Sequence, residues 1–285
     1  MAHYEPVNGI YRKVTKQYEP VNGIYRKVTK AYKPVDGVYR QYFSSGIPVS
    51  TLAVGDSVWL NVNGSLTEFL VVHQGNPNSK IYPSSCKGTW VLMKDTYGSQ
   101  MFDAGEEYED QDGELWLYGD ARYQESDIHN YLNNTFLKLL SSGVQSSIKQ
   151  ARIPYYHWGV NESHNNAVVK YGSNGLSTKI FLLSVFELGG QSSWDADFVE
   201  DGASLDYFSG TAYRDAKRIA YYNGTAVTWW TRSAGNYYGD RVYIVDKDGR
   251  PYQPQVTYYQ QQVRPALILN SSTLIDQSTG VNIIA

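Results

Sequence analysis

The first 45 residues constrain the fold most, because they contain three tandem copies of a 14-residue unit. The copies span residues 4–17, 18–31 and 32–45, and the third has drifted from the first two. Each contains a Pro-Val-Asn-Gly or Pro-Val-Asp-Gly turn followed by a short strand pattern. One such unit is too small to bury an apolar face, so the copies should stack or pair with another chain. We therefore predict a docking or attachment segment at residues 1–45 and a separate domain at residues 46–285.

Basic residues are concentrated in these repeats. They are Arg12, Lys13, Lys16, Arg26, Lys27, Lys30, Lys33 and Arg40. They are compatible with a solvated linker, a docking segment for a larger assembly, or weak contact with nucleic acid. The whole chain argues against the last, because its net charge of -3 and pI near 6.0 differ from those of a general nucleic-acid binder. We expect no nucleic-acid partner.

Targeting and cysteine chemistry are also constrained. No apolar run approaches the roughly 20 residues that a membrane span needs, and residues 1–6 lack the basic start and apolar core of a secretory signal. We therefore expect no membrane span and synthesis in the cytoplasm, from which a virion protein can leave by lysis. Cys86 is the single cysteine, which excludes an intrachain disulfide and a multi-cysteine zinc site. Its surroundings favour an inert thiol.

From residue 49 onwards, the hydrophobic pattern predicts an α+β domain of short antiparallel strands and a few helices. Alternation around Asn63-Gly64 predicts a hairpin within residues 49–72. Ser126 should cap a helix with apolar positions at Ile128, Tyr131, Leu132 and Phe136. Residues 246–249 read as a hairpin turn in which Gly249 can adopt a positive φ. The other predicted elements are a strand at 89–94, a helix at 144–150, a buried strand or strand and helix at 178–188, a short helix or loop at 214–220, and β patterns at 227–232, 241–246, 255–261 and 264–269.

Tyrosine is unusually abundant, with 26 residues against 8 Phe and 7 Trp. An ordinary core draws more on Phe, Leu and Ile, because a buried hydroxyl needs a hydrogen-bond partner. Tyrosine is favoured where a side chain must offer both apolar area and a polar tip to another molecule. The composition therefore favours a binding surface.

Three stretches in sequence order carry a family resemblance. They are ESDIHNYLNNTFLKLLSSGVQSSIKQARI (125–153), STKIFLLSVFELG (177–189) and TWWTRSAG (228–235), closed by VRPALIL (263–269). Together they resemble a domain of undefined activity in bacterial and prophage proteins that is often carried at phage tails. That domain is similar to the C-type-lectin-like fold of the variable proteins of diversity-generating retroelements. The N-terminal repeats are similar to repeats that precede such domains in phage tail proteins. The resemblance implies an α+β, C-type-lectin-like ligand-binding domain.

The resemblance also implies where a ligand would bind. In that family a scaffold presents a C-terminal segment whose exposed side chains are rewritten by adenine-directed mutagenesis. The matching segment is 235–265, and its candidate ligand contacts are Asn236, Tyr237, Tyr238, Asp240, Arg241, Tyr243, Tyr252, Gln253, Gln255, Tyr258, Tyr259, Gln260 and Gln261. Tyr supplies rigid contact area at low entropic cost, and Arg is another common hot-spot residue. The alternative is a Tyr-rich ribbon that packs on its own domain.

Several residues near this segment are expected to form the scaffold instead. Val242, Ile244 and Val256 should anchor the strands in the core. Trp229 and Trp230 should also be buried. Arg232 and Arg264 should bond backbone carbonyls or a buried carboxylate.

No catalytic constellation is evident, so we expect no enzymatic activity, no cofactor and no metal site. Two acidic clusters could suit a carbohydrate-active enzyme, but their spacing singles out no acid–base pair. They are Glu106, Glu107, Glu109, Asp110, Asp112 and Glu114, and Asp195, Asp197, Glu200, Asp201 and Asp206. Residues 110–114 are a fragment of a calcium loop that is too short for an EF-hand, which leaves calcium binding open. His157 and His164 lack the spacing of two ligands on one helical face.

The resemblance thus implies a phage tail receptor-binding protein for host adhesion. Its partners would be a bacterial cell-surface protein or glycan and, through residues 1–45, other tail subunits. Self-association, for example as a trimer, is compatible with the repeats. We expect the protein in the virion, or in the bacterial cytoplasm if it is prophage-encoded. A carbohydrate-active enzyme and a purely structural tail or baseplate subunit are the alternatives.

Overall fold

The computed structural model describes the backbone of six short strands within residues 4–44 and, beyond them, residues 46–109, 111–157, 168–194, 198–235, 239–252, 260–277 and 279–284. Each N-terminal repeat forms one antiparallel hairpin, because its Pro-Val-Asn-Gly or Pro-Val-Asp-Gly motif separates two short β segments. The strands are β1 (Tyr4–Val7), β2 (Ile10–Lys13), β3 (Gln17–Val21), β4 (Ile24–Val28), β5 (Lys30–Val35) and β6 (Val38–Ser44). Among the described residues, each of these strands pairs only within its own hairpin.

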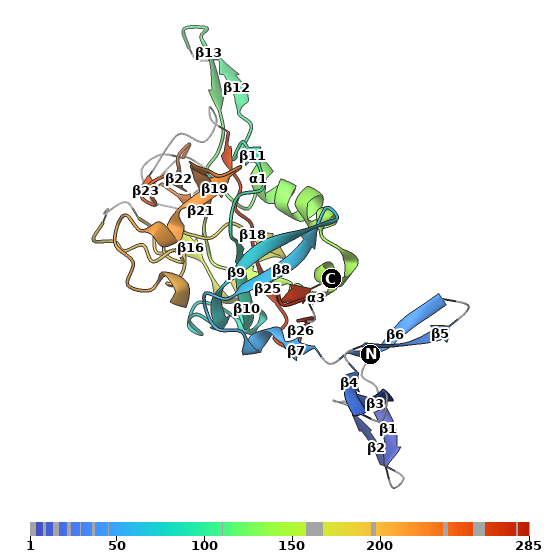
Figure 1. Ribbon diagram of the computed structural model, residues 1–285. Coiled ribbons are helices and arrows are strands. Elements are labelled where there is room, and N and C mark those ends of the chain that lie inside the picture. The colour runs from blue at the N-terminus through green and yellow to red at the C-terminus, as the bar shows by residue number, and fades with distance from the viewer. Residues whose placement is uncertain are drawn as a thin grey trace.

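A six-stranded sheet forms the centre of the domain (Figure 1). Its order is β18 (Ile180–Phe181), β25 (Ala266–Leu269), β10 (Gly88–Met93), β9 (Ser65–Gly75), β8 (Ser57–Val62) and β27 (Ile283–Ile284). Only the β27–β8 pair is parallel among these neighbours. The sheet therefore joins segments from both ends of the domain sequence.

The hairpin predicted at Asn63-Gly64 is the β8–β9 connection. Asn63 has a φ of 49° and Gly64 a φ of 79°, the paired positive values of a type I′ turn. The Asn61 side chain accepts a hydrogen bond from the Gly64 amide at 3.0 Å, which holds the turn. Turn chemistry fixes this connection locally, and the prediction is confirmed.

A five-stranded sheet lies toward the C-terminal half of the chain. Its order is β11 (Ser99–Gln100), β24 (Gln261–Gln262), β21 (Trp229–Ala234), β22 (Val242–Val245) and β23 (Pro251–Tyr252). β21 and β24 run parallel, and the other neighbours are antiparallel. Every residue of β21 and β22 is buried, so these are the central strands and β23 is an edge.

A 13-residue helix begins after Ser126, as predicted. It consists of α1 (Asp127–Asn130), the π-helical turn η3 (Tyr131–Phe136) and α2 (Leu137–Leu139). The Ser126 hydroxyl accepts a hydrogen bond from the His129 amide, and Ile128, Leu132 and Phe136 are buried. The second helix, α3 (Ser142–Ser147), ends earlier than the predicted 144–150, because Ile148 bridges to Leu269 of the central sheet.

The remaining elements are short. The strand pairs are β12 (Glu106–Glu109) with β13 (Leu115–Tyr118), β14 (Ala151–Ile153) with β17 (Leu176–Thr178), β15 (Tyr155–His157) with β16 (Val168–Lys170), β19 (Ala220–Tyr222) with β20 (Thr225–Val227), and β26 (Leu274–Ile275) with β7 (Ile47–Pro48). The described residues also form short 3-10 helices of one turn each. They are η1 (Val49–Thr51), η2 (Ser84–Cys86), η5 (Gly172–Asn174), η6 (Asp206–Phe208) and η7 (Ala216–Arg218). The apolar stretch at 178–188 contains the last residue of β17 and the two residues of β18, and no longer strand. Its side chains are nevertheless buried, except at the half-buried Lys179 and Phe186.

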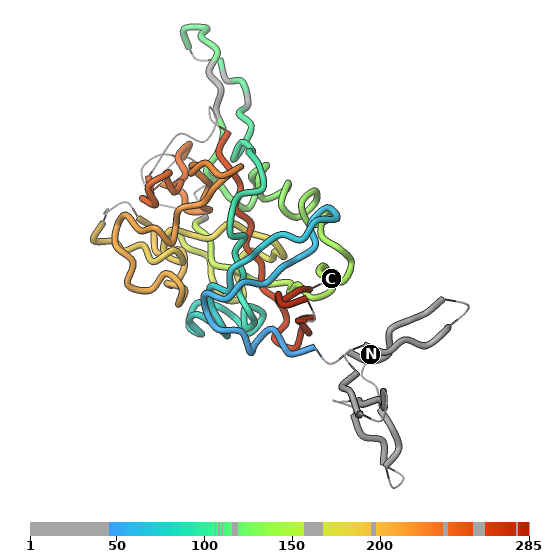
Figure 2. Tube along the Cα trace, in the orientation of Figure 1, coloured from blue at the N-terminus to red at the C-terminus, as the bar shows by residue number. Residues whose placement is uncertain are grey.

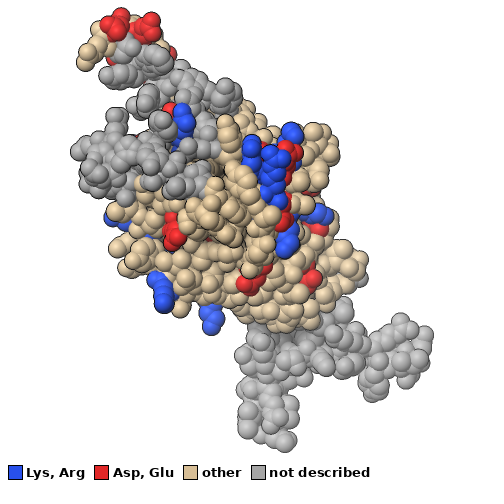
Figure 3. All heavy atoms as spheres, turned by 90° about the vertical axis from the view of Figure 1, so that its left-hand side faces the viewer, with Lys and Arg blue, Asp and Glu red and all other residues tan. Residues whose placement is uncertain are grey.

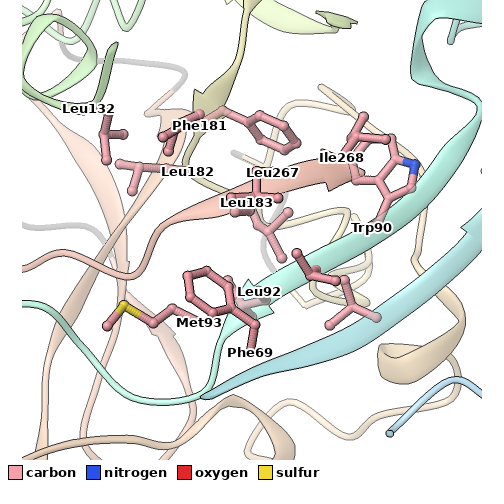
Figure 4. Packing of buried hydrophobic residues seen from close by; sticks show 14 of the residues in the cluster. Phe69, Trp90, Leu92, Met93, Leu132, Phe181, Leu182, Leu183, Leu267 and Ile268 are labelled. Carbon is pink, nitrogen blue, oxygen red and sulfur yellow. The ribbon is translucent and has the colours of Figure 1, made fainter. Parts of the chain in front are cut away.

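The main core lies between the central sheet, the helix and the segment that follows β18. Figure 4 shows side chains from β9, β10, β25 and residues 181–183 converging with Leu132 of the helix. Trp90 packs edge-on against Phe181 with ring centroids 5.5 Å apart. The protein is mostly β with one 13-residue helix and several mixed sheets, so the α+β, β-rich expectation is confirmed at that level.

Candidate functional site

Side chains of β21 and of the segments packed against it form a buried polar network. We use this name for Arg232, Glu187, Asp201, Tyr82 and Ser233. Arg232 donates to both Glu187 carboxylate oxygens, with Nη2 to Oε1 at 2.7 Å, and both side chains are fully buried. It also donates to the carbonyls of three separate segments, those of Pro154, Leu182 and Asp201. This confirms the prediction that Arg232 bonds a buried carboxylate and backbone carbonyls. One guanidinium thus ties β21 to the segment after β18.

Electrostatics within this network are strongly perturbed. Burial alone would lower the pKa of Arg232, but the adjacent Glu187 carboxylate more than offsets this and raises it. Burial raises the pKa of Asp201 to about 6, against the opposing effects of Arg232 and the hydrogen bond from Ser233. Ser233 donates to Asp201 at 2.9 Å and accepts from the Val185 amide. The network is therefore structural, since its polar atoms bond one another and the backbone.

Arg264 and the two tryptophans also form scaffold, as predicted. Arg264 donates to the carbonyls of Met93 at 2.8 Å and Lys94 at 2.7 Å, and its guanidinium lies 4.9 Å from the Trp229 ring centroid. Burial lowers its pKa to about 10. Trp229 and Trp230 are both fully buried. These contacts join the central sheet to the five-stranded sheet.

Arg218 is a third buried arginine, and it holds the loops at the edge of the five-stranded sheet. Its guanidinium donates to the carbonyl of Leu188 at 2.9 Å and to that of Gly249 at 2.9 Å. It also donates to the carbonyls of Ala212 and Tyr213. Burial lowers its pKa. Three chain segments far apart in sequence are therefore fixed by one side chain.

Aromatic side chains cover this anchor; we call Trp194, Tyr213, Arg250 and Tyr252 the aromatic face. The Arg218 guanidinium lies 5.3 Å from the Trp194 ring centroid, and Trp194 packs edge-on against Tyr213 at 5.5 Å. The Tyr213 hydroxyl donates to the carbonyl of Pro251, which places Tyr213 next to β23. Tyr252 is 53% exposed and Tyr213 38% exposed, with Arg250 5.4 Å from the Tyr252 ring centroid. The face presents aromatic area from three segments on a fixed base.

The turn at Gly249 positions the β22–β23 hairpin beneath this face. Gly249 has a φ of 76°, as predicted, and a Cβ there would lie 2.1 Å from the carbonyl oxygen of Asp215. The turn therefore lies directly against the backbone of the loop that precedes Arg218. Asp246 caps the same turn by accepting from the amides of Asp248 and Arg250.

Comparison with known proteins assigns this region to a family of unknown activity. Residues 87–271, more than half of the chain, match the family model described as Domain of unknown function (DUF6273). The chain belongs to the DUF6273 family. No curated protein and no solved structure matches it. The DUF6273 region contains the aromatic face and all of the buried polar network except Tyr82, whereas the repeats and β8–β9 lie outside it.

The predicted ligand contacts that the structure describes differ in their exposure to solvent. Tyr252 and Gln260 are exposed, and Asp240, Arg241 and Gln261 are half-buried. Gln260 accepts a hydrogen bond from Ser99, and Gln261 lies opposite Gln100 in the β11–β24 ladder. The contacts predicted at Asn236, Tyr237, Tyr238, Gln253, Gln255, Tyr258 and Tyr259 lie outside the described residues, as do Val256 and the larger part of the β pattern at 255–261.

The expectation that Tyr243 is an exposed contact is wrong. It is 1% exposed and packs against Phe198 with ring centroids 4.6 Å apart. The reason is that β22 is buried on both faces: Val242 and Ile244 face the main core, as predicted, while Tyr243 joins a second cluster with Val185 and Phe198. Trp194 packs against that cluster, so Tyr243 supports the aromatic face from within.

Sequence reasoning missed Trp194, Tyr213 and Arg218. The only sequence signal was the overall excess of tyrosine, because these residues lie outside the C-terminal segment. Their role depends on contacts between segments that are distant in sequence. The fold alone brings them together.

The second acidic cluster considered for catalysis is divided between different environments. Asp201 is buried in the polar network, Glu200 and Asp206 are exposed, and Asp195 and Asp197 lie outside the described residues. Within the described part of the chain, no group of three or more His, Cys, Asp or Glu side chains could hold a metal ion. Cys86 is buried, and burial raises the pKa of its thiol. None of the described helices is long and apolar enough to cross a membrane.

Proposed function

We propose that this protein is a non-enzymatic binding protein that recognises a bacterial cell-surface molecule through the aromatic face and the adjoining segment 236–262. We further propose that its domain is a variant of the C-type-lectin-like fold and that it serves as a receptor-binding component of a phage tail. Residues 1–45 would attach it to other tail subunits. Diversification of the segment by a retroelement is part of this proposal.

One observation carries the binding proposal: aromatic side chains from three segments, of which Tyr213 and Tyr252 are exposed, lie around a single buried anchor, Arg218. An aromatic side chain held in one conformation loses little entropy on binding. Arg250 adds a second type of residue that is enriched in binding hot spots. The contacts of Arg218 with Gly249 and with Tyr213 provide that rigidity. This arrangement suits recognition without covalent chemistry.

The proposals of a C-type-lectin-like fold, a phage tail role and retroelement diversification rest on the family resemblance. The DUF6273 match covers all three stretches from which that resemblance was drawn, at 125–153, 177–189 and 228–235. The third stretch contains β21, and the strands that would carry the variable segment follow it along the chain. A reverse transcriptase gene beside this gene, with a near-copy of the 236–262 coding segment that differs at adenines, would support diversification.

Binding to cells tests the proposed function. Fluorescently labelled full-length protein is incubated with intact cells of the bacterium that carries the gene and of close relatives, and bound label is measured by flow cytometry. Tyr252→Ala and Tyr213→Ala should each reduce binding at least about tenfold, as expected for hot-spot side chains. Tyr171→Ala is a matched control, because Tyr171 is 51% exposed and lies outside the aromatic face.

Two outcomes would overturn the proposal. One is that no labelled protein binds any of these cells. The other is that Tyr171→Ala reduces binding as much as Tyr252→Ala does. Release of soluble glycan from the cells by the protein would instead favour the carbohydrate-active enzyme.

A further inference from the structure

A projecting hairpin carries a second surface. The strands β12 and β13 extend from the domain in Figure 1, and among the described residues they pair only with each other. We call residues 106–118 the acidic hairpin. An isolated two-stranded hairpin is at best marginally stable in water, which favours a surface that is covered by a partner.

The charge of this hairpin is entirely negative. Residues 106–118 contain no Lys or Arg, and their acidic residues are Glu106, Glu107, Glu109, Asp110, Asp112 and Glu114. Figure 3 shows acidic side chains gathered at the end of the projection. Glu107 and Glu109 are exposed and lie two positions apart on β12, which places them on one face. Leu115 lies opposite Glu109 and is 68% exposed, so that face combines carboxylates with an apolar side chain.

The third repeat hairpin has the complementary charge. The register places Glu5 opposite Arg12 and Glu19 opposite Arg26 in the first two repeats, so each of these arginines has an acidic cross-strand neighbour. The lysines beside them, Lys13 and Lys27, lie opposite tyrosines. In the third repeat, Lys33 lies opposite Arg40. Like charges directly opposite each other destabilise a ladder. The strands β5 and β6 contain Lys30, Lys33 and Arg40 and no acidic residue, so this hairpin would gain from an anionic partner.

The short link between the third repeat hairpin and the domain favours an anionic partner from another molecule. Only residues 45 and 46 separate β6 from β7, and β7 is fixed to the domain by its pairing with β26. β7 lies at the opposite end of the domain from β12 and β13 (Figures 1 and 2). The chain therefore enters the domain, after the third repeat, at the end remote from the acidic hairpin.

We propose that the acidic hairpin of one molecule binds the third repeat hairpin of a second copy, so that chains associate head to tail. Glu107 and Glu109 lie against Lys33 and Arg40 in this contact. Such a heterologous interface closes into a ring or extends into a filament. The first two repeats, in which a glutamate lies opposite each arginine, remain available for other subunits.

Charge reversal tests this contact in the full-length protein. Sedimentation velocity is measured over a concentration series at about 0.05 M and about 0.5 M NaCl, since salt screens exposed charges. The wild-type protein should associate at low salt and return toward the monomer at high salt. Glu107→Lys/Glu109→Lys and Lys33→Glu/Arg40→Glu should each weaken association at least about tenfold. Glu200→Lys/Asp248→Lys, which reverses exposed acidic residues elsewhere, should associate like the wild type.

Mixing the two reversed variants provides the decisive result. Each offers the charge that the other lacks, so an equimolar mixture should regain the association that both have lost alone. Thermal melts of the separate variants verify that each is folded. The proposal is overturned if the wild type remains monomeric at low salt, if either reversed variant associates as the wild type does, or if folded variants fail to associate when mixed.

Discussion

The buried polar network and the aromatic face use similar side chains for opposite purposes. In the network, Arg232 and Glu187 satisfy each other away from water. On the aromatic face, Arg250 and Tyr252 pair on a surface that solvent reaches. The contrast is sharpest between Tyr243 on β22 and Tyr252 on β23, which are 1% and 53% exposed on neighbouring strands. The buried Tyr243 can only support the aromatic face from within, whereas the exposed Tyr252 can contact a ligand.

The largest expected effect of any substitution is at Arg232. Arg232→Met leaves Glu187 as an uncompensated buried charge, which should lower the free energy of unfolding by about 3–5 kcal/mol. Denaturant unfolding followed by circular dichroism measures this loss. The double variant Arg232→Met/Glu187→Leu should recover part of it, because both charges are then removed. A double variant that is less stable than Arg232→Met would contradict this account of the network.

Tyr243→Ala should have the next largest effect. It leaves a cavity beside Phe198 and Val185 and should cost about 2–4 kcal/mol of unfolding free energy. Because Trp194 packs on the same cluster, the variant should also lose binding to cells. Denaturant unfolding together with the cell-binding assay checks both effects. A stable Tyr243→Ala protein would mean that this ring contributes little packing.

Asp201 should produce a smaller effect that depends on pH. Its folded pKa of about 6 lies above the ordinary value of 3.8, so the folded state holds this proton more tightly. The associated stabilisation is complete below about pH 4 and is lost as pH rises toward and through 6. Asp201→Asn avoids this loss and should become more stable relative to the wild type by about 1–3 kcal/mol between pH 4 and pH 7. Thermal melts of both proteins across that range test it, and a difference that does not change with pH would contradict it.

Local chemistry made much of the fold predictable from sequence. Asn63-Gly64, Gly249 and the Ser126 cap each determine backbone geometry within a few residues, and all three predictions are confirmed. Tyr243 shows where such reasoning fails. Alternation predicts one exposed face for a strand, but β22 is covered on its second face by Phe198 and Val185, which are distant in sequence. The aromatic face was missed for the same reason, since Arg218 assembles it from segments that share no local pattern.

The smallest expected effect on stability is at Tyr252, and it completes the comparison with Tyr243. Tyr252 lies on the edge strand β23 with more than half of its surface exposed, and its described ring contact is with Arg250. Tyr252→Ala should therefore change the free energy of unfolding by no more than about 0.5 kcal/mol, as is usual for surface substitutions. Denaturant unfolding of Tyr252→Ala beside Tyr243→Ala measures the contrast directly. A loss above about 2 kcal/mol at Tyr252 would show that its ring holds β23 in place. The aromatic face would then be part of the packing, because a side chain selected for contact with a partner should be dispensable for folding.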